Sequence, residues 1–350
     1  MLGTKLIQAS SGNTGGGAPP ATEYLALADT SIPFVHVYPW STSGFGTKYS
    51  NPASQPSNNG KSVAFSPSVN DIAVSTASSP YCAAYPWSSS GFGTRYSNPS
   101  TALPGTCEEV AFSPSGNAIA FATNSSPYIQ AYEWSSGFGT KYSNPSTLPT
   151  SQMYAVKFTP SGNAVITGGV GGSSMHAYAW SDVSGFGTKY SDPATQPATT
   201  TIALDINAAG TAILGGVFNT TANAWNWSDA TGFGAKYSSP ATGPSGRVRS
   251  CAFAKDDSAV AIGSEGSPYI DAWAWSNSTG FGSKYSNPAT APTGLVYEAV
   301  FSKNSDALCC AHSTSPFVTV YAWSTSGFGA KFSNPSTLPT NICNGADFSS

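Results

Sequence analysis

Residues 87–99 read Trp87-Ser-Ser-Ser-Gly-Phe-Gly-Thr-Arg-Tyr-Ser-Asn-Pro99, and close variants of this phrase occur seven times in the 350-residue chain. Each copy opens on a tryptophan: Trp40, Trp87, Trp134, Trp180, Trp227, Trp275 and Trp323. Neighbouring copies lie 46 to 48 residues apart, and every copy contains Gly-Phe-Gly. A period of this size predicts a fold built from equivalent units that bury their apolar faces against one another.

A second repeated phrase lies midway between the tryptophans and is clearest at Val110-Ala-Phe-Ser-Pro-Ser-Gly-Asn-Ala-Ile-Ala-Phe-Ala122. β-Branched and aromatic residues alternate in it, and Gly or Pro interrupts them often, which favours short strands over helices. For this period we expect strands at 110–113, 118–123, 128–134 and 140–143. Four short strands in each period, with a Trp late in the unit, predict the blade of a β-propeller.

The residues before each Trp indicate how the third strand of a unit is buried. The positions three and five before the Trp are apolar in all seven copies, as at Ala131 and Ile129. The position two before it is always aromatic: Tyr38, Tyr85, Tyr132, Tyr178, Trp225, Trp273 and Tyr321. Because alternate side chains of a strand point to opposite faces, we expect one face against a neighbouring blade and the rings wedged between sheets.

The two ends of the chain predict how the ring closes. The first repeat supplies strands at 24–29, 34–40 and 47–50. At the other end of the chain, residues 345–349 match the first strand of a later repeat. We therefore expect an all-β, seven-bladed β-propeller with four antiparallel strands per blade, closed by the C-terminal strand completing the N-terminal blade. This makes 21–350 a single domain. Residues 1–20, rich in Gly and Ser, are expected to form a flexible arm.

The composition excludes several functional classes. Charged residues make up 9% of the chain and the net charge is −3, which argues against nucleic-acid binding through a basic surface. No apolar run is long enough for a membrane-spanning helix, and the N-terminus lacks the apolar core of a signal peptide. Hydrophobic residues reach 40% and aromatic residues 13%, enough for a sizeable core.

One repeated motif resembles known propeller families. Phe112-Ser-Pro-Ser-Gly-Asn117 and the apolar strand after it are similar to WD-repeat and YVTN-type propellers, a resemblance that covers about residues 22–350. The chain departs from WD repeats because it has neither a Gly-His nor a Trp-Asp pair. The phrase led by Trp resembles propeller proteins among the virion components of tailed bacteriophages. The resemblance implies the fold but no single activity, because propellers serve as enzymes, receptors and scaffolds.

One column of basic residues follows the Gly-Phe-Gly turns: Lys48, Arg95, Lys141, Lys189, Lys236, Lys284 and Lys331. We expect these side chains to protect the exposed edge of each blade from pairing with other sheets. The alternative is a cationic ring that binds an anionic partner.

The other residues able to support chemistry are dispersed. His36 and His176 fall in opposite blades, and the six cysteines occupy core positions or blades that do not touch, so we expect no metal site, no cofactor and no disulfide. Lys157 and Asp205, in adjacent blades at the channel, are expected to form a structural ion pair.

The candidate partner surface lies on the loops that join one blade to the next. These loops differ most between repeats, and they or the strands next to them carry Tyr154, Arg247, Arg249 and Tyr297. Variation among copies suits recognition of an asymmetric partner, and unconstrained drift explains it equally well. In the arm, Leu6 and Ile7 are candidate contacts with a neighbouring subunit.

These observations predict a non-enzymatic structural or attachment component of a phage particle, made in the host cytoplasm and present in several copies in the virion. Its expected partners are other virion or assembly proteins and possible host-surface glycans, without nucleic acid or membrane insertion. One alternative is a multivalent carbohydrate-binding, lectin-like propeller with equivalent pockets between its blades. Another is a propeller enzyme of the lactonase or lyase type. The alternative locations are the bacterial cytoplasm and the cell surface.

Overall fold

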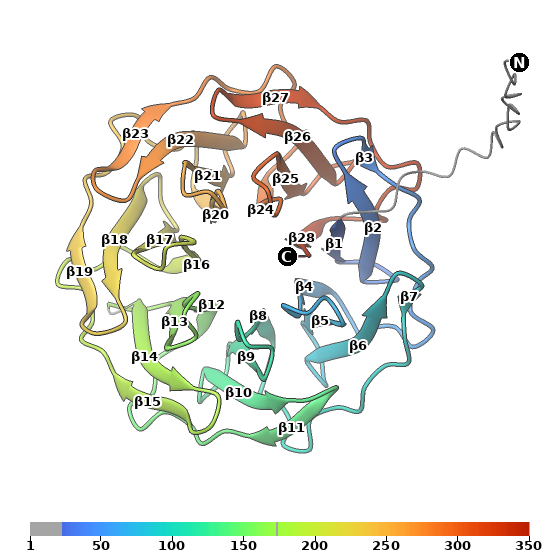
Figure 1. Ribbon diagram of the computed structural model, residues 1–350, viewed down its shortest axis with the longest axis vertical. Helices are drawn as coiled ribbons and strands as arrows, with labels where there is room; N and C mark the ends of the chain where they lie inside the picture. The colour runs from blue at the N-terminus through green and yellow to red at the C-terminus, as the bar shows by residue number, and fades with distance from the viewer. Residues whose placement is uncertain (1–22, 173, 350) are drawn as a thin grey trace, which may run out of the picture.

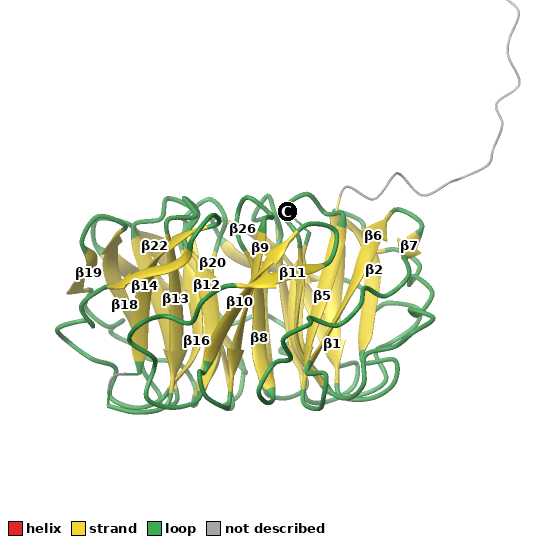
Figure 2. Cartoon of the chain, turned by 90° about the horizontal axis from the view of Figure 1, so that it is seen from below, coloured by secondary structure: helices red, strands yellow, loops and turns green. Residues whose placement is uncertain are grey.

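The computed structural model describes residues 23–172 and 174–349, which form seven four-stranded antiparallel sheets arranged in a ring (Figure 1). Each sheet runs from a strand at the central axis to a strand at the outer wall (Figure 1). Seen from the side, the strands span a short cylinder with loops at both ends (Figure 2). The expected all-β seven-bladed propeller is confirmed. No helix in the described ranges is long and apolar enough to cross a membrane.

We number the blades in chain order: blade 1 contains β28, β1, β2 and β3, blade 2 contains β4–β7, and the remaining blades follow in fours. The innermost strands are β28 (Cys343–Phe348), β4 (Gly60–Phe65), β8 (Cys107–Phe112), β12 (Met153–Phe158), β16 (Thr201–Ile206), β20 (Val248–Phe253) and β24 (Val296–Phe301). The second strands are β1 (Glu23–Asp29), β5 (Asp71–Thr76), β9 (Ala118–Thr123), β13 (Ala164–Gly169), β17 (Ala212–Val217), β21 (Ala259–Ser264) and β25 (Ala307–His312). The third strands are β2 (Val35–Ser41), β6 (Cys82–Ser88), β10 (Ile129–Trp134), β14 (Met175–Ser181), β18 (Ala222–Ser228), β22 (Ile270–Ser276) and β26 (Val318–Ser324). The outer strands are β3 (Gly44–Phe45), β7 (Gly91–Phe92), β11 (Phe138–Lys141), β15 (Gly185–Lys189), β19 (Gly232–Lys236), β23 (Gly280–Lys284) and β27 (Gly327–Lys331).

The outer strands differ from the sequence-based expectation. The sequence analysis places Gly-Phe-Gly in a turn and starts the outer strand after it, at 140–143 in blade 3 and 47–50 in blade 1. The structure instead pairs the Phe of each motif with the Trp that opens the same phrase, as in Trp134↔Phe138 and Trp40↔Phe45. The outer strand therefore begins inside the motif. Pairing the two rings across adjacent strands also puts them in edge-to-face contact.

Aromatic contacts join every blade to the next. Trp134 packs edge-on against Phe138 of its own blade and against Tyr96 of the preceding blade, with ring centroids 5.1 and 5.4 Å apart. The same contact between neighbouring blades recurs at all seven junctions, and Phe332 against Trp40 completes the set at 5.0 Å. The repeated phrase thus encodes the packing between blades as well as the turn.

The aromatic column two residues before each Trp is fully buried, as expected, and each ring has a polar role. The Tyr85 hydroxyl donates to the Ser54 carbonyl at 2.7 Å, and the Trp225 indole N–H donates to the Thr195 carbonyl at 2.9 Å. All seven rings make this bond to the loop that leads into their blade. Tyr and Trp both occur at this position because each places a hydrogen-bond donor at the tip of a large ring.

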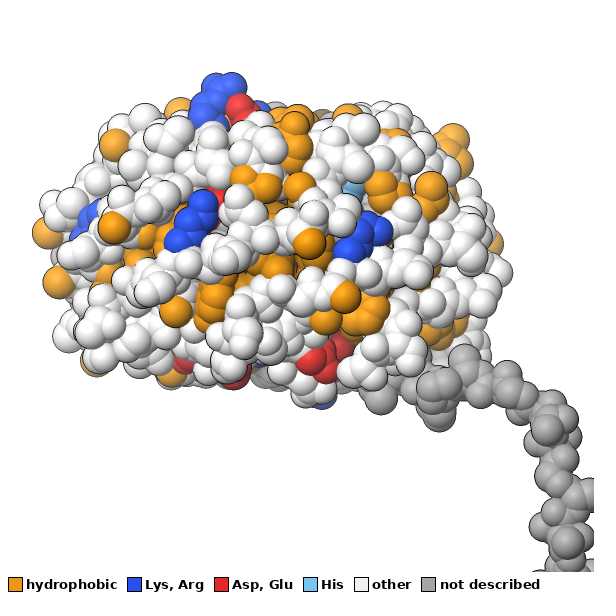
Figure 3. Space-filling model, turned by 90° about the horizontal axis from the view of Figure 1, so that it is seen from above, with side chains coloured by type: hydrophobic (Ala, Val, Ile, Leu, Met, Phe, Trp, Pro, Cys, Tyr) orange, Lys and Arg blue, Asp and Glu red, His pale blue; other side chains and the backbone are white. Residues whose placement is uncertain are grey.

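The basic column is half-buried, and six of its seven side chains bond to the loop that follows their outer strand. The seventh, Lys284, pairs with Asp271 of β22. Lys141 Nζ donates to the Tyr142 carbonyl at 3.2 Å and to the Asn144 side chain at 2.5 Å. Lys48 and Lys331 repeat these bonds. On the face shown in Figure 3, Lys and Arg side chains are scattered among uncharged surface. The column therefore supports loops locally, and its protection of the blade edges stays a prediction.

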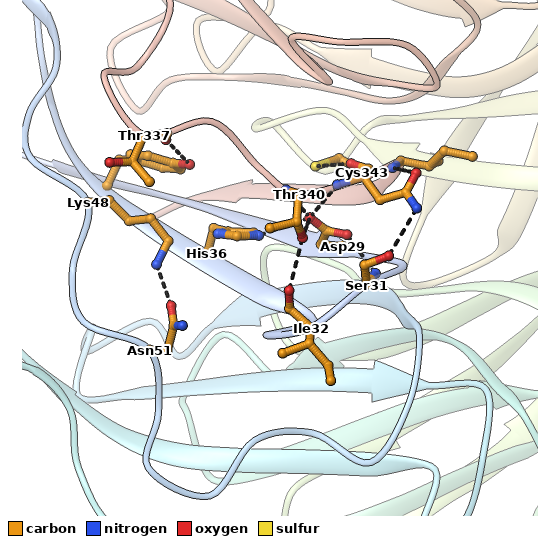
Figure 4. Close-up of polar contacts among 12 residues, drawn as sticks. Asp29, Ser31, Ile32, His36, Lys48, Asn51, Thr337, Thr340 and Cys343 are labelled. Atoms are coloured by element: carbon orange, nitrogen blue, oxygen red, sulfur yellow. Dashed lines mark hydrogen bonds and ion pairs between the residues drawn. The ribbon is translucent and has the colours of Figure 1, made fainter.

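The ring closes as predicted, through the C-terminal strand. β28 pairs antiparallel with β1, with Leu25 opposite Phe348 and Leu27 opposite Ala346. At the same junction, the buried Asp29 carboxylate accepts hydrogen bonds from His36 and from the backbone and hydroxyl of Thr340 (Figure 4). The seven sheets use residues within the expected 21–350 domain. The expected arm at 1–20, with Leu6 and Ile7, lies outside the described residues, and its role stays a prediction.

Candidate functional site

The second residue of every innermost strand lies at one end of the central channel. There the seven side chains surround a pocket of about 410 Å³. They are Lys61, Glu108, Tyr154, Ile202, Arg249, Tyr297 and Asn344. We call this pocket the channel mouth. It lies at the end where the loops between blades enter the inner strands, so the most variable part of each repeat shapes it.

Three of the four residues predicted as a partner surface meet at the channel mouth. Tyr154, Arg249 and Tyr297 line it together, from three different blades. Arg247 does not line the mouth; its side chain is 54% exposed and pairs with Glu265. The structure thus places these residues at one end of the ring, while their partners stay a prediction.

Arg249 is held in place by a carboxylate and two rings. Its Nε donates to Glu265 at 2.7 Å, and its guanidinium lies 4.8 Å from the Phe218 ring centroid and 5.8 Å from that of Tyr297. Arg247 stacks on Phe218 as well, at 4.7 Å. A guanidinium fixed by an ion pair and stacking loses little further freedom when it binds a ligand.

Two glutamates of blade 3 link it to both neighbouring blades. Glu108 pairs with Lys61 of blade 2 at 3.2 Å, and Glu109 pairs with Lys157 of blade 4 at 2.7 Å. Glu109 also accepts the Val156 backbone N–H at 2.7 Å. The sequence analysis did not single out these glutamates. The sequence feature that could have identified them is their position near the start of an inner strand, next to the variable loops.

The prediction that Lys157 forms an ion pair with Asp205 is wrong. The lysine bonds to Glu109 on its other side, and Asp205 accepts the Phe253 backbone N–H of the following blade at 2.7 Å. Asp347 binds the Phe65 N–H in the same way, at 2.8 Å. Each carboxylate satisfies a backbone donor across a junction between blades, which the sequence pattern does not reveal.

Glu298 differs from the other carboxylates of the channel. It lines both the mouth and the channel below it, and no described residue hydrogen-bonds its carboxyl group. Burial raises the pKa of Glu298 well above its ordinary value, Lys157 opposes this rise, and the charges of Glu109, Asp205 and Asp347 reinforce it. Burial also raises the pKa of Asp347, to about 6. A carboxyl group with a raised pKa in a water-accessible pocket is suited to proton transfer.

The histidines and cysteines do not contribute to this site. His36 bonds to Asp29, His176 lies 3.2 Å from Asp192, and His312 lies 3.0 Å from the Thr319 hydroxyl, each in a different blade. All six cysteines are buried and unpaired. Among the residues that the structure describes, no three His, Cys, Asp or Glu side chains group as a metal site would require.

Comparisons with known proteins identify the fold. No family model matches the chain, and no curated protein matches it. Among solved structures, a candidate 6-phosphogluconolactonase from Bacteroides fragilis NCTC 9343 is similar with a TM-score of 0.74 and 11% identity, over 95% of this chain and 99% of that one. A protein from Lactobacillus plantarum gives a TM-score of 0.73 and 13% identity, over 93% and 99%. A second candidate 6-phosphogluconolactonase, from Bacteroides uniformis ATCC 8492, gives 0.67 and 12%, also over 93% and 99%. At these identities the likeness establishes a seven-bladed β-propeller and nothing finer.

Proposed function

We propose that the channel mouth binds a small oxygen-rich molecule and that the protein hydrolyses it as a lactonase-type enzyme, with Glu298 as the acid–base group. The observation that carries this proposal is the carboxyl group of Glu298, to which no described residue hydrogen-bonds, in a pocket lined by Arg249 and Lys61. The half-buried rings of Tyr154 and Tyr297 offer apolar surface to a sugar-derived ring. This proposal departs from the non-enzymatic role expected from the sequence.

The chemistry needs one group that takes a proton and then returns it. The Glu298 carboxylate accepts a proton from a water molecule while the water oxygen bonds to the lactone carbonyl carbon. As the bond from that carbon to the ring oxygen breaks, Glu298 returns the proton to the ring oxygen, and a hydroxy acid results. The cations Lys61 and Arg249 favour the negative charge that develops on the carbonyl oxygen.

The structural neighbours support the reaction class through the fold alone. Two of them are candidates for 6-phosphogluconolactonase. Because propellers of one fold host many activities, this support is an analogy, and the argument depends on Glu298. The expected place in a phage particle, with its virion partners, stays a prediction.

The test compares lactone hydrolysis by the intact protein, Glu298→Gln and Glu133→Gln. The substrates are glucono-δ-lactone, 6-phosphogluconolactone and a simple aliphatic lactone, with spontaneous hydrolysis subtracted. We expect acceleration of at least one sugar lactone, a loss of about 100-fold or more in Glu298→Gln, and no loss in Glu133→Gln, whose side chain is exposed. The rate should rise with pH through the raised pKa of Glu298, because the ionised form acts. No acceleration of any lactone, or full activity in Glu298→Gln, would refute the proposal.

A further inference from the structure

The turn between the third and outer strands varies in length among the blades. Two residues separate Trp134 from Gly137 in blade 3, whereas four separate the corresponding residues in blades 4, 5 and 6 and three do so in the other blades. These turns lie at the end of the ring opposite the channel mouth, beside the turns that follow the inner strands of the preceding blade. Their length therefore decides how much of each junction the chain itself covers.

In blades 4 and 5 an aspartate of the longer turn occupies the junction. The Asp182 carboxylate accepts the Trp180 indole N–H at 2.7 Å and the hydroxyl of Ser115 from blade 3. Asp229 repeats this arrangement with Trp227, at 2.8 Å, and with the hydroxyl of Ser161. At these junctions the protein supplies its own polar group to the hydroxyl and the indole.

At the junction of blades 2 and 3 the short turn leaves an open pocket of about 340 Å³. Asp71, at the start of β5, replaces the missing turn aspartate: it accepts the Trp134 indole N–H at 3.0 Å and the Tyr96 hydroxyl at 2.7 Å. The corresponding position in the next blade is Ala118. Asp71 thus satisfies the Trp134 indole N–H and the Tyr96 hydroxyl, while the space that a longer turn would fill stays open.

The lining of this pocket defines the chemistry of its ligand. Among the residues that the structure describes, it presents hydroxyl groups, side-chain amides and one carboxylate, and no Lys or Arg; these groups come from Ser68, Asn70, Asp71, Asn117, Ser135 and Ser136. An anion would face Asp71 without a compensating cation. An apolar ligand would remove these polar groups from water without replacing their hydrogen bonds. A molecule with several neutral hydroxyl groups satisfies both conditions, because amides, hydroxyls and carboxylate oxygens can all bond to hydroxyls.

We propose that the pocket between blades 2 and 3 binds a neutral saccharide unit. The volume lies in the range of small-molecule sites, roughly 300–1,000 Å³, and the rings of Tyr96 and Trp134 contribute to its wall beside the polar groups. The site is separate from the channel mouth and independent of the reaction proposed there. It also differs from the seven equivalent pockets of the lectin-like alternative, because it arises at a junction where the turn is shortest.

Equivalent residues in other blades show which mutations should close the pocket. Inserting Asp-Val between Ser135 and Ser136 gives blade 3 the turn of blade 4, and the added Asp71→Ala gives blade 2 the alanine that blade 3 has at position 118. A milder variant is Asn70→Ala, because this side chain is exposed and makes no hydrogen bond within the described residues. Asn163→Ala is its matched control, since it changes the equivalent position at a junction that Asp229 fills.

Binding is measured by saturation-transfer NMR with glucose, galactose, mannose, fucose and N-acetylglucosamine, with gluconate as the anionic comparator. We expect one or more of the neutral sugars to bind the intact protein and gluconate not to bind at this site. The closed turn should abolish binding, Asn70→Ala should weaken it about tenfold, and Asn163→Ala and Glu298→Gln should leave it unchanged. The proposal is wrong if none of the five sugars binds or if binding survives the closed turn. If the closed turn does not fold, unchanged binding in Asn70→Ala overturns the proposal instead.

Discussion

Asp29 and His36 are buried side by side where the two ends of the ring meet, with the His36 Nε2 atom 2.9 Å from the carboxylate. The carboxylate also accepts the backbone N–H groups of Ser31, Thr340 and Asn341. Thr76 takes the place of Asp29 in blade 2, so the charged group is suited to this particular junction. Burial alone would raise the pKa of Asp29, but the hydrogen bonds and the imidazole lower it overall.

The lowered pKa predicts how stability depends on pH. The carboxylate stabilises the fold fully above its ordinary pKa of 3.8, and this contribution is lost as the pH falls through the lower folded-state value. Asp29→Asn should cost about 2 kcal/mol at pH 7 and should lose less stability on acidification than the intact protein. Urea unfolding at a series of pH values measures both effects. Asp256→Asn, at an exposed turn, is the control, and equal behaviour of the two variants would contradict the assignment.

At the scale of one element, the turn into the outer strand explains why Gly-Phe-Gly recurs. The first Gly of the motif has a positive φ in all seven blades, from 75° to 126°. The Phe between the glycines pairs with the Trp of its blade, and a Cβ on the second Gly of blade 4 would lie 3.2 Å from Ala179. The first Gly therefore supplies the positive φ that this turn requires.

Gly185→Ala tests this requirement. Its φ of +75° is unfavourable for alanine, and the added Cβ would lie 2.7 Å from the Tyr142 ring of the preceding blade. We expect a loss of about 1–3 kcal/mol, measured by thermal or chemical unfolding. Gly172→Ala provides the comparison, because no described part of the chain comes within 4 Å of a Cβ there and the substitution should change stability little. Equal losses in the two variants would show that the turn tolerates a side chain.

At the scale of the whole molecule, stability depends on a closed circle of contacts. β28 completes blade 1, packs Phe348 against Trp40 at 5.6 Å, and carries Asp347 to the Phe65 N–H of blade 2. Without this strand, β1 would expose the edge that pairs with β28, and blade 1 would lose the contact between Phe348 and Trp40. The junction with blade 2 would lose the hydrogen bond from the Phe65 N–H to Asp347.

Deleting residues 342–350 should therefore abolish the cooperative unfolding transition or cause aggregation. Phe348→Ala keeps the strand and should cost about 3–5 kcal/mol through the cavity it leaves. Differential scanning calorimetry and size-exclusion chromatography report both outcomes. A truncated protein that melts cooperatively within a few degrees of the intact chain would rule out closure by β28.

The blade count, the closing strand and the buried aromatic columns could all be predicted from the amino-acid sequence. These features depend on alternation within a strand and on a period of 46 to 48 residues, both of which are local and visible in one chain. The sequence misplaced the start of the outer strands, because a Gly-rich motif reads as a turn even when its Phe pairs with a Trp. It also placed Tyr154, Arg249 and Tyr297 beside the loops that join the blades, where the structure groups them around one pocket.

Which charged side chains pair with one another becomes visible in the folded chain alone. Lys157 has a neighbouring blade on each side. It forms an ion pair with Glu109, whereas Asp205 accepts a backbone N–H of the following blade, and both outcomes depend on distances between side chains of different blades. The raised pKa of Glu298 also depends on the folded arrangement, because burial and charged groups from several blades act together on its carboxyl group. Likewise, the shortest turn was visible as the 46-residue spacing, but the open pocket beside it required Asp71 to take over the bond to Trp134. Such contacts join residues far apart in the chain, and no periodic pattern encodes them.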